Sequence, residues 1–196
     1  MIDTPEKVEN ITFAKASGSP CPPPKGMTPR PGQIVCGDID MRIATDGTWF
    51  YHGSPINREK LVKLFSTVVR RDDAGDYWLI TPAEMARITV DDAPFLAVEM
   101  AEANDKDVKS LKFRTNVDKW VTADKSHPIR VEIDTDTSEP RPYIRLADDG
   151  TEARINRAVF YQLVENAVVA DVDGRDMLIV ESAGETFQLG PAAEET

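Results

Sequence analysis

The spacing of apolar and polar positions along the chain predicts short strands separated by turns, together with two helices. Apolar and polar residues alternate at 41–44, an Asp-Gly turn follows at 45–48, and an aromatic run returns at 49–52, which is typical of a β-hairpin. Apolar residues then recur at helical spacing from about residue 58, with Asn57 as the expected N-cap. Strands are also expected at 77–80, 87–90, 95–100, 111–115, 120–122 and 129–133.

This order of elements occurs twice, which predicts an internal duplication. Residues 41–48 match residues 144–151 at five of eight positions, at an offset of 103. After a four-residue deletion the offset becomes 99, and Ile56-Asn57-Arg58 then matches Ile155-Asn156-Arg157. A strand, a turn, a capped helix and a second strand align in the same order, which coincidence does not readily produce.

The duplication predicts an α+β fold made of two tandem copies of a β-rich unit, each with one packed helix. The first unit is expected at 37–100 and the second, with the strands that precede it, at 101–196. A cleft between two such units would be a common place for a ligand pocket. Both helices carry an apolar stripe that needs burial against a sheet. The stripes consist of Leu61, Leu64, Phe65 and Val68 in the first copy and of Phe160, Leu163, Val164 and Ala167 in the second.

Residues 1–36 are expected to form a separate N-terminal segment. Thr4-Pro5-Glu6 is typical of a helix start, with Thr4 as the N-cap, and a short helix to about Ala16 is expected. Six prolines between residues 20 and 31 disfavour both a helix and a strand ladder, so residues 18–32 are expected to be an extended leader that wraps the surface. The leader is interpreted as a spacer, with a ligand for an aromatic groove of a partner as the alternative.

Composition limits the partners and the compartment. The 196 residues include 34 acidic and 23 basic side chains, and the net charge of −11 disfavours binding to nucleic acid or to an anionic membrane. No stretch approaches the roughly 18 apolar residues of a membrane span, and the N-terminus does not resemble a signal peptide. A cytoplasmic protein is therefore expected. Cys21 and Cys36 have neither the spacing of a zinc site nor the number of a disulfide framework.

Catalytic signatures are absent from the sequence. There is no Gly-rich phosphate loop, nucleophile elbow or HExxH helix. Three acidic pairs have the spacing of metal ligands, but they lack the remaining ligands of a calcium loop and are interpreted as solvated turns. These pairs are Asp38/Asp40, Asp134/Asp136 and Asp171/Asp173. No catalytic residue, metal site or cofactor is therefore predicted, and a hydrolase that uses carboxylates and one histidine is the weakest of three hypotheses.

Two arginines occupy equivalent positions of the repeat and are candidates for ligand binding. Arg42 and Arg145 each lie between apolar neighbours on an expected strand. A planar guanidinium binds phosphate or carboxylate through two parallel hydrogen bonds, so such a pair is suited to an anionic ligand. The alternative for both residues is a structural ion pair with one of the many carboxylates.

Other candidates come from an aromatic cluster in the first copy and from polar residues in the middle of the chain. Trp49, Tyr51 and His52 have no counterparts in the second copy and can stack on a base or hydrogen-bond a ligand, although ordinary packing is the alternative. Thr115-Asn116 and His127 lie near expected strand ends and can orient a ligand, although such residues are also common in turns.

Several linked segments of the chain resemble the bacterial domain-of-unknown-function family 1285. The resemblance rests on residues 41–58, 61–66, 79–84 and 90–95, and it is extended by residues 113–116 and 141–143. These segments cover most of the chain beyond the leader. Ala83-Glu84-Met85 and Arg87 depart mildly from a more basic pattern in the family, so no role is carried over to that turn.

The resemblance implies a duplicated core whose C-terminal part is similar to a pleckstrin-homology β-structure, with a pocket at the domain interface. It also implies a nucleotide-like ligand and a role in bacterial signal transduction. The matching positions that would lie near such a pocket are Arg42, Trp49, Tyr51, Thr115, Asn116, His127 and Arg145.

The main hypothesis is therefore a non-enzymatic ligand-binding or sensory protein. It would bind a small anionic ligand, such as a nucleotide, between the repeats, with His52 added to the seven positions above. The alternative is a protein–protein interaction module without a small ligand, indicated by the acidic composition and the proline-rich leader.

Overall fold

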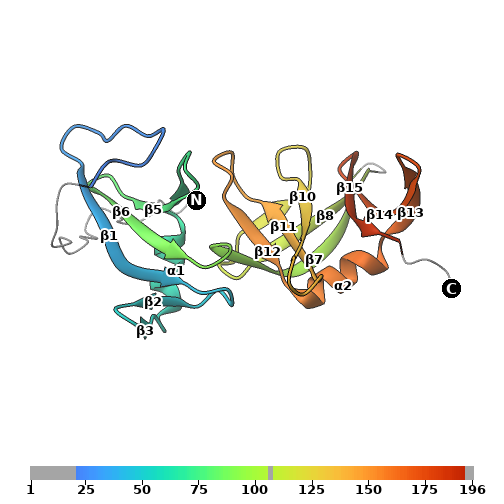
Figure 1. The fold of residues 1–196 in the computed structure, drawn as a ribbon, viewed down its shortest axis with the longest axis horizontal. Coiled ribbons are helices and arrows are strands. Elements are labelled where there is room, and N and C mark those ends of the chain that lie inside the picture. Colours follow the sequence, from blue (N-terminus) through green and yellow to red (C-terminus); the bar gives the residue numbers. More distant parts are fainter. Residues whose placement is uncertain (1–20, 106–107, 193–196) are drawn as a thin grey trace. The chain divides into compact units, whose positions relative to one another are not determined.

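The computed structural model describes residues 21–105 and 108–192 of the chain (Figure 1). The chain divides into two compact units between Pro94 and Phe95, here called unit 1 and unit 2. Both units are rich in β-structure and each contains one helix. The helix expected at 4–16 lies outside the described residues. No helix in the described ranges combines the length and the apolar character that crossing a membrane requires.

Unit 1 is a six-stranded sheet with one helix. The strand order is β3-β2-β1-β6-β5-β4, in which β1 and β6 run parallel and the other neighbours run antiparallel. The elements are β1 (Ile34–Ile43), β2 (Trp49–Tyr51), β3 (Ser54–Pro55), α1 (Glu59–Ser66), β4 (Val69–Arg71), β5 (Tyr77–Ile80) and β6 (Glu84–Val90).

The core of unit 1 contains Phe65 and Val68 of the predicted apolar stripe, whereas Leu61 and Leu64 are half-buried and Val68 follows the end of α1. Phe65 of this helix is buried and stacks on Trp49, with ring centroids 6.2 Å apart and planes 14° from parallel. The helix begins one residue later than expected. Arg58, rather than Asn57, is the N-cap, because its extended backbone (φ −87°, ψ 96°) delays the first helical turn to Glu59. The expected cap at Asn57 is therefore wrong, and Arg58 makes no side-chain cap bond.

Unit 2 contains a six-stranded sheet in the order β10-β11-β12-β7-β8-β9 and a three-stranded sheet in the order β13-β14-β15. Strands β12 and β7 are parallel, and the strands of the smaller sheet are antiparallel. The elements are β7 (Phe95–Asp105), β8 (Val108–Thr115), β9 (Trp120–Thr122), β10 (Ile129–Ile133), β11 (Pro140–Arg145), β12 (Glu152–Ile155), α2 (Arg157–Glu165), β13 (Val168–Val172), β14 (Arg175–Ser182) and β15 (Glu185–Pro191).

A buried serine and a capped helix fix the internal packing of unit 2. Ser182 of β14 donates through Oγ to the carbonyl of Ala123 over 2.6 Å and accepts from the N–H of Leu111 over 2.8 Å, so the smaller sheet is bonded to the larger one. Asn156 caps α2 as predicted, because its side chain accepts from the N–H of Val159 over 2.8 Å. Leu163 of α2 is fully buried.

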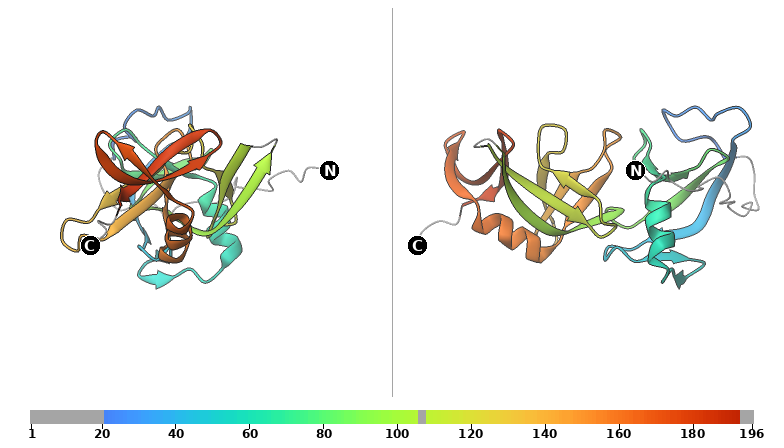
Figure 2. Two further views of the ribbon diagram at one scale, coloured as in Figure 1. Left: turned by 90° about the vertical axis from the view of Figure 1, so that its right-hand side faces the viewer. Right: turned by 180° about the vertical axis from the view of Figure 1, so that it is seen from behind.

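The duplication is visible in the order of elements. The series β1-β2-α1-β4-β5-β6 recurs as β11-β12-α2-β13-β14-β15, and the sequence offset of 99 aligns the two helices and the strands that follow them. Figure 2 shows α1 and α2 from two further sides. The copies differ in how their first strand is paired. Strand β1 lies between β2 and β6, whereas its counterpart β11 lies between β12 and β10. The β-rich, duplicated architecture predicted from the sequence is confirmed.

Candidate functional site

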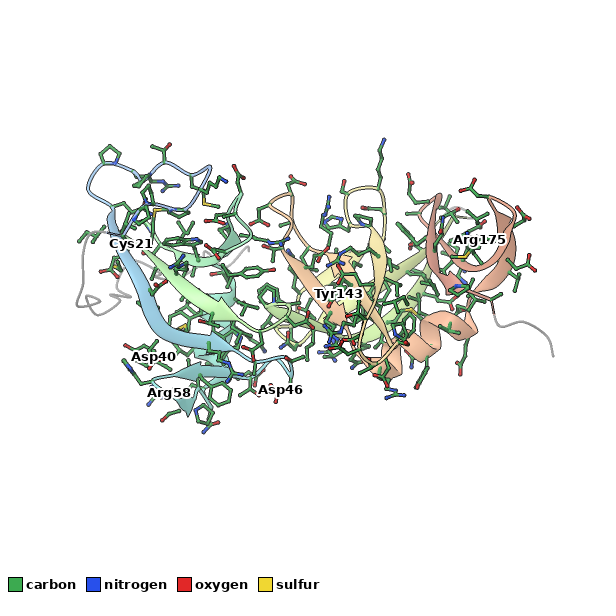
Figure 3. The ribbon with its side chains drawn as sticks, in the orientation of Figure 1. Cys21, Asp40, Asp46, Arg58, Tyr143 and Arg175 are labelled. Atoms are coloured by element: carbon green, nitrogen blue, oxygen red, sulfur yellow. The ribbon has the colours of Figure 1, made fainter. Side chains whose placement is uncertain are left out.

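The described part of the leader, residues 21–33, is bonded to the surface of unit 1. The backbone N–H of Lys25 donates to Asp72 Oδ2 over 3.0 Å, and the carbonyl of Lys25 accepts from the N–H of Asp73 over 3.1 Å. Further along, Gln33 Nε2 donates to the carbonyl of Thr81 over 2.6 Å. Cys21, labelled in Figure 3, is the first described residue of this segment. The described part of the leader is thus attached to the surface of unit 1 by hydrogen bonds.

Asp72 joins the leader, the β4–β5 turn and strand β5. Asp72 is 6% exposed. Its carboxylate accepts four hydrogen bonds of 2.9–3.0 Å, which come from the backbone N–H groups of Lys25, Ala74 and Asp76 and from the indole N–H of Trp78. Burial by itself raises the pKa of the Asp72 carboxyl, but the four hydrogen bonds outweigh it and hold this pKa below its ordinary value. An ionised carboxylate is therefore part of the folded state.

Gly26 allows the leader to lie close to the Asp72 turn. Its φ of +77° belongs to the left-handed region, and a Cβ at this position would lie 2.0 Å from Asp73 Oδ2. Gly37 has a similar role beneath Cys21, because a Cβ there would lie 2.9 Å from the Cβ of Cys21. A larger residue would have to displace the Asp73 side chain at Gly26 and the Cys21 side chain at Gly37.

A pocket of about 330 Å³ lies between the leader and strands β5 and β6. Prolines, a cysteine and the Trp78 side chain supply apolar surface, and charged groups stand among them. The lining residues are Cys21, Pro22, Pro23 and Lys25 from the leader and Asp72, Ala74, Asp76, Trp78 and Arg87 from the sheet and its turn. Every one of these residues belongs to unit 1.

Arg87 is held beside the pocket by two carboxylates. Its Nε and one terminal nitrogen bind the two oxygens of Asp38, and its other terminal nitrogen donates to Asp76 Oδ2 over 3.2 Å. The hydrogen bond to Asp38 raises the pKa of Arg87 and lowers the pKa of Asp38. The guanidinium also lies 5.9 Å from the Trp78 ring centroid. These bonds occupy three of the five N–H groups of a guanidinium.

Lys25 contributes a second positive charge to the pocket. Within the described ranges, its ammonium forms no ion pair, while its backbone is fixed by Asp72. The two carboxylates of the lining are already engaged, since Asp76 is paired with Arg87 and Asp72 accepts four donors. Of the two cationic residues in the lining, Lys25 is therefore the one without an ion-pair partner in the described ranges, and Arg87 keeps two further N–H groups.

The two arginines predicted as anion ligands lie elsewhere. Arg42 on β1 forms a two-point ion pair with Asp91, in which its Nε donates to Oδ1 over 2.8 Å, and its guanidinium lies 5.9 Å from the Phe50 ring centroid. This is the structural alternative considered for Arg42. Arg145 is exposed at the end of β11, where it lies opposite Glu152 in the register.

The aromatic cluster of the first copy is split between the core and the surface. Trp49 is 1% exposed and packs against α1, as the packing alternative holds. Tyr51 and His52 are exposed, with ring centroids 4.2 Å apart, and His52 Nδ1 lies 3.2 Å from Asp40 Oδ2. Figure 3 labels Asp40.

The polar candidates of unit 2 are engaged in turns. Thr115 is fully buried, and its Oγ1 accepts from the N–H of Lys119 over 3.1 Å. Asn116 accepts from the N–H of Leu96 through Oδ1 over 3.1 Å. His127 Nδ1 lies 3.0 Å from Asp124 Oδ1 within one tight turn.

The eight predicted residues fall into two groups, and none of them lines the pocket. Arg42, Trp49, Tyr51 and His52 belong to unit 1, and Thr115, Asn116, His127 and Arg145 belong to unit 2. Sequence reasoning passed over the residues that do line it. The one signal was the acidic Asp72–Asp76 turn, which the sequence marks as a turn without showing that a leader 47 residues away in the chain binds to it.

Together, the sheets and helices define a two-domain, β-rich protein built on a duplicated unit. Residues 30–93 match the N-terminal domain of DUF1285, described as a domain of unknown function, and residues 94–189 match its C-terminal domain, described as a protein of unknown function. The chain belongs to the DUF1285 family. The family resemblance predicted from the sequence is confirmed.

Two solved structures are similar to the chain. A DUF1285 family protein from Silicibacter pomeroyi DSS-3 is 40% identical, with a TM-score of 0.73 over 86% of this chain and 91% of that protein. A DUF1285 family protein from Shewanella baltica OS155 is 26% identical, with a TM-score of 0.50 over 65% of this chain and 91% of that protein. No curated protein matches the chain.

Proposed function

We propose that the chain is a non-enzymatic protein that binds a small anionic ligand in the pocket beneath the leader of unit 1. The observation that supports this proposal is a pocket of about 330 Å³ that is lined in part by Lys25, whose ammonium has no ion-pair partner among the described residues. Pockets of this size, mainly apolar with a few placed polar groups, are typical of small-molecule sites.

The unpaired ammonium of Lys25 favours an anionic group on the ligand. Arg87 forms ion pairs with Asp38 and Asp76, whereas Lys25 forms no ion pair with a described residue. A phosphate or carboxylate would pair with Lys25 and accept the remaining N–H groups of Arg87. The apolar part of the ligand would then lie against Trp78 and the prolines of the leader.

We extend this proposal to the class of ligand, the cellular role and the fold of unit 2. The family resemblance favours a nucleotide-based ligand and a role in bacterial signal transduction, in which this chain would act as a cytoplasmic sensor of the ligand. It also favours a pleckstrin-homology-like unit 2, and the compact β-structure with the single packed helix α2 is compatible with this. The alternative hypothesis, a protein-interaction module, draws support from an exposed strand of unit 2.

Isothermal titration with inorganic phosphate, pyrophosphate and a panel of mononucleotides and cyclic nucleotides tests the proposal. Lys25→Gln keeps the backbone contact to Asp72 and removes the charge, so it should weaken binding about tenfold. Arg87→Gln should do the same. Lys112→Gln and Arg114→Gln are matched controls in unit 2, since Lys112 is an exposed strand lysine and Arg114 also pairs with two carboxylates, Glu99 and Asp118. Equal binding by all four variants, or no binding by any probe, would contradict the proposal.

A further inference from the structure

Strands β4 and β13 are equivalent edge strands of the two copies. Each follows the helix of its copy and forms a hairpin with the next strand, and each ends its sheet. On the outer side of an edge strand, alternate residues present unpaired N–H and C=O groups, which are a template for another strand. Proteins therefore need to block such edges or use them.

The β4 edge of the first copy is blocked by its own arginine. One terminal nitrogen of Arg70 donates to the carbonyl of Val69 over 2.6 Å and to the carbonyl of Thr67 over 3.1 Å. Val69 itself is 3% exposed. This edge is short and charged, its carbonyls at Thr67 and Val69 are occupied by Arg70, and its Val69 side chain is buried, so it is poorly suited to an incoming strand.

The β13 edge of the second copy lacks these features. At the offset of 99, Val168 and Val169 replace Val69 and Arg70, and they are 57% and 59% exposed. Strand β13 has five residues and is paired with β14 on one side, while no described strand is paired with its other side. The second copy therefore presents a longer, apolar and unblocked edge.

The charges along β13 indicate what could cover it. Asp171 of β13 lies directly opposite Asp176 of β14, and like charges in that relation destabilise a sheet. Neither carboxylate is ion-paired in the described part of the chain. The turn of this hairpin adds a third exposed carboxylate, Asp173, and the basic residue of the hairpin is Arg175, labelled in Figure 3.

We propose that β13 is a docking edge that adds an extended segment of a partner protein, apolar in most positions and basic opposite Asp171. A cation at that position would relieve the repulsion between Asp171 and Asp176, and the apolar positions would cover Val168 and Val169. A second copy of this chain fits less well. Two β13 strands paired antiparallel about Ala170 would bring together two acidic hairpins and two chains that each carry a net charge of −11.

The register of β13 specifies the pattern of the incoming strand. Val169 and Asp171 share one face, and Val168, Ala170 and Val172 share the other. An antiparallel partner, read from its N-terminus, would therefore place an apolar residue beside Val172, a lysine or arginine beside Asp171, and apolar or small residues beside the remaining three positions. This mode of binding uses main-chain hydrogen bonds for affinity and alternate side chains for specificity.

A labelled peptide with the core Val-Lys-Val-Thr-Val, flanked by single lysines, is the probe for this edge. Fluorescence anisotropy measures its binding to the full chain, and hydrogen–deuterium exchange locates it. Exchange should slow at the amides of residues 168–172. A peptide with glutamate in place of the core lysine should bind about tenfold more weakly, because it meets Asp171 with a like charge.

Variants distinguish β13 from other exposed apolar surface. Val169→Arg introduces the residue type that blocks β4 and should weaken peptide binding about tenfold. Val108→Arg makes the same change at another exposed valine of unit 2, on a strand paired with β7, and should leave binding unchanged. Unchanged binding by Val169→Arg, slowed exchange outside residues 168–172, or a dimer in sedimentation that Val169→Arg dissociates while the peptide does not bind, would each overturn the proposal.

Discussion

The hairpins β4–β5 and β13–β14 descend from one repeat, yet their equivalent aspartates lie in opposite environments. Asp72 is buried and accepts four hydrogen bonds, two of them from the leader residue Lys25 and the indole of Trp78. Its counterpart Asp171 is exposed and accepts the N–H of Gly174 over 3.1 Å. The same turn residue becomes an anchor only in the copy where a leader and an indole supply the additional donors.

Removing the Asp72 carboxylate should have the largest effect on this contrast. Asp72→Ala leaves four donors without their acceptor, and the expected loss in the free energy of unfolding is about 2–4 kcal/mol. Asp171→Ala removes an exposed carboxylate and should change the free energy of unfolding by about 0.5 kcal/mol or less. Urea denaturation measures both, and similar losses for the two variants would show that the copies do not differ in this way.

The pH dependence of stability should separate the two aspartates next. The pKa of Asp72 in the folded protein lies below its unfolded value of about 3.9. Its stabilising contribution is therefore complete above that value and is lost as the pH falls toward the folded pKa. Between about pH 5 and pH 3, the urea midpoint of the unaltered protein should fall more steeply than that of Asp72→Asn. Asp171→Asn is the control, and parallel curves for the protein and Asp72→Asn would refute the expectation.

The fit of the leader to the turn gives a third, smaller effect. Gly26→Ala places a Cβ against the Asp73 carboxylate at a positive φ, and Gly32→Ala has a similar φ with no atom within 4 Å. Both variants share the backbone strain, so Gly26→Ala should cost about 1 kcal/mol more than Gly32→Ala. Because an Asp73→Ala background shortens the blocking side chain, the difference between the two glycine variants should shrink there. A difference that stays the same in the Asp73→Ala background would show that the Asp73 carboxylate is not its cause.

Exchanging the edge residues should have the smallest effect on stability. Arg70→Val combined with Val169→Arg alters two exposed positions, so the free energy of unfolding should change by about 0.5 kcal/mol or less. Arg70→Val frees the carbonyls of Thr67 and Val69, and peptide-dependent protection from hydrogen exchange should move from residues 168–172 toward residues 69–71. Protection that stays at residues 168–172 in the exchanged protein would show that the arginine does not decide which edge is open.

The sequence was sufficient for the features that repeat locally. Spacing of apolar residues located both helices, and the Asn156 cap and the short strands of unit 2 were also found. Contacts between distant segments were not accessible in this way. Asp72 has the ordinary signature of an acidic turn, and nothing local distinguishes it from Asp171, although the bond from Lys25 crosses 47 positions of the chain.

The contacts of two predicted site residues, Arg42 and Trp49, likewise could not be foreseen from the local sequence. Arg42 was singled out because it recurs at the equivalent position of the repeat, but recurrence also selects residues that maintain the fold, and its carboxylate partner Asp91 lies 49 positions away. Trp49 was singled out because the second copy lacks it, and the structure shows that it fills the space against Phe65. A pocket made by two segments distant in sequence has no local pattern to mark it.

The attachment of the leader also affects how this pocket can diversify. The family match begins at residue 30, whereas Cys21, Pro22, Pro23 and Lys25 supply one wall of the pocket. The main-chain bond from Lys25 to Asp72 does not depend on which side chain residue 25 carries. Relatives that keep the aspartate and vary the leader would therefore retain the same scaffold with a different selectivity.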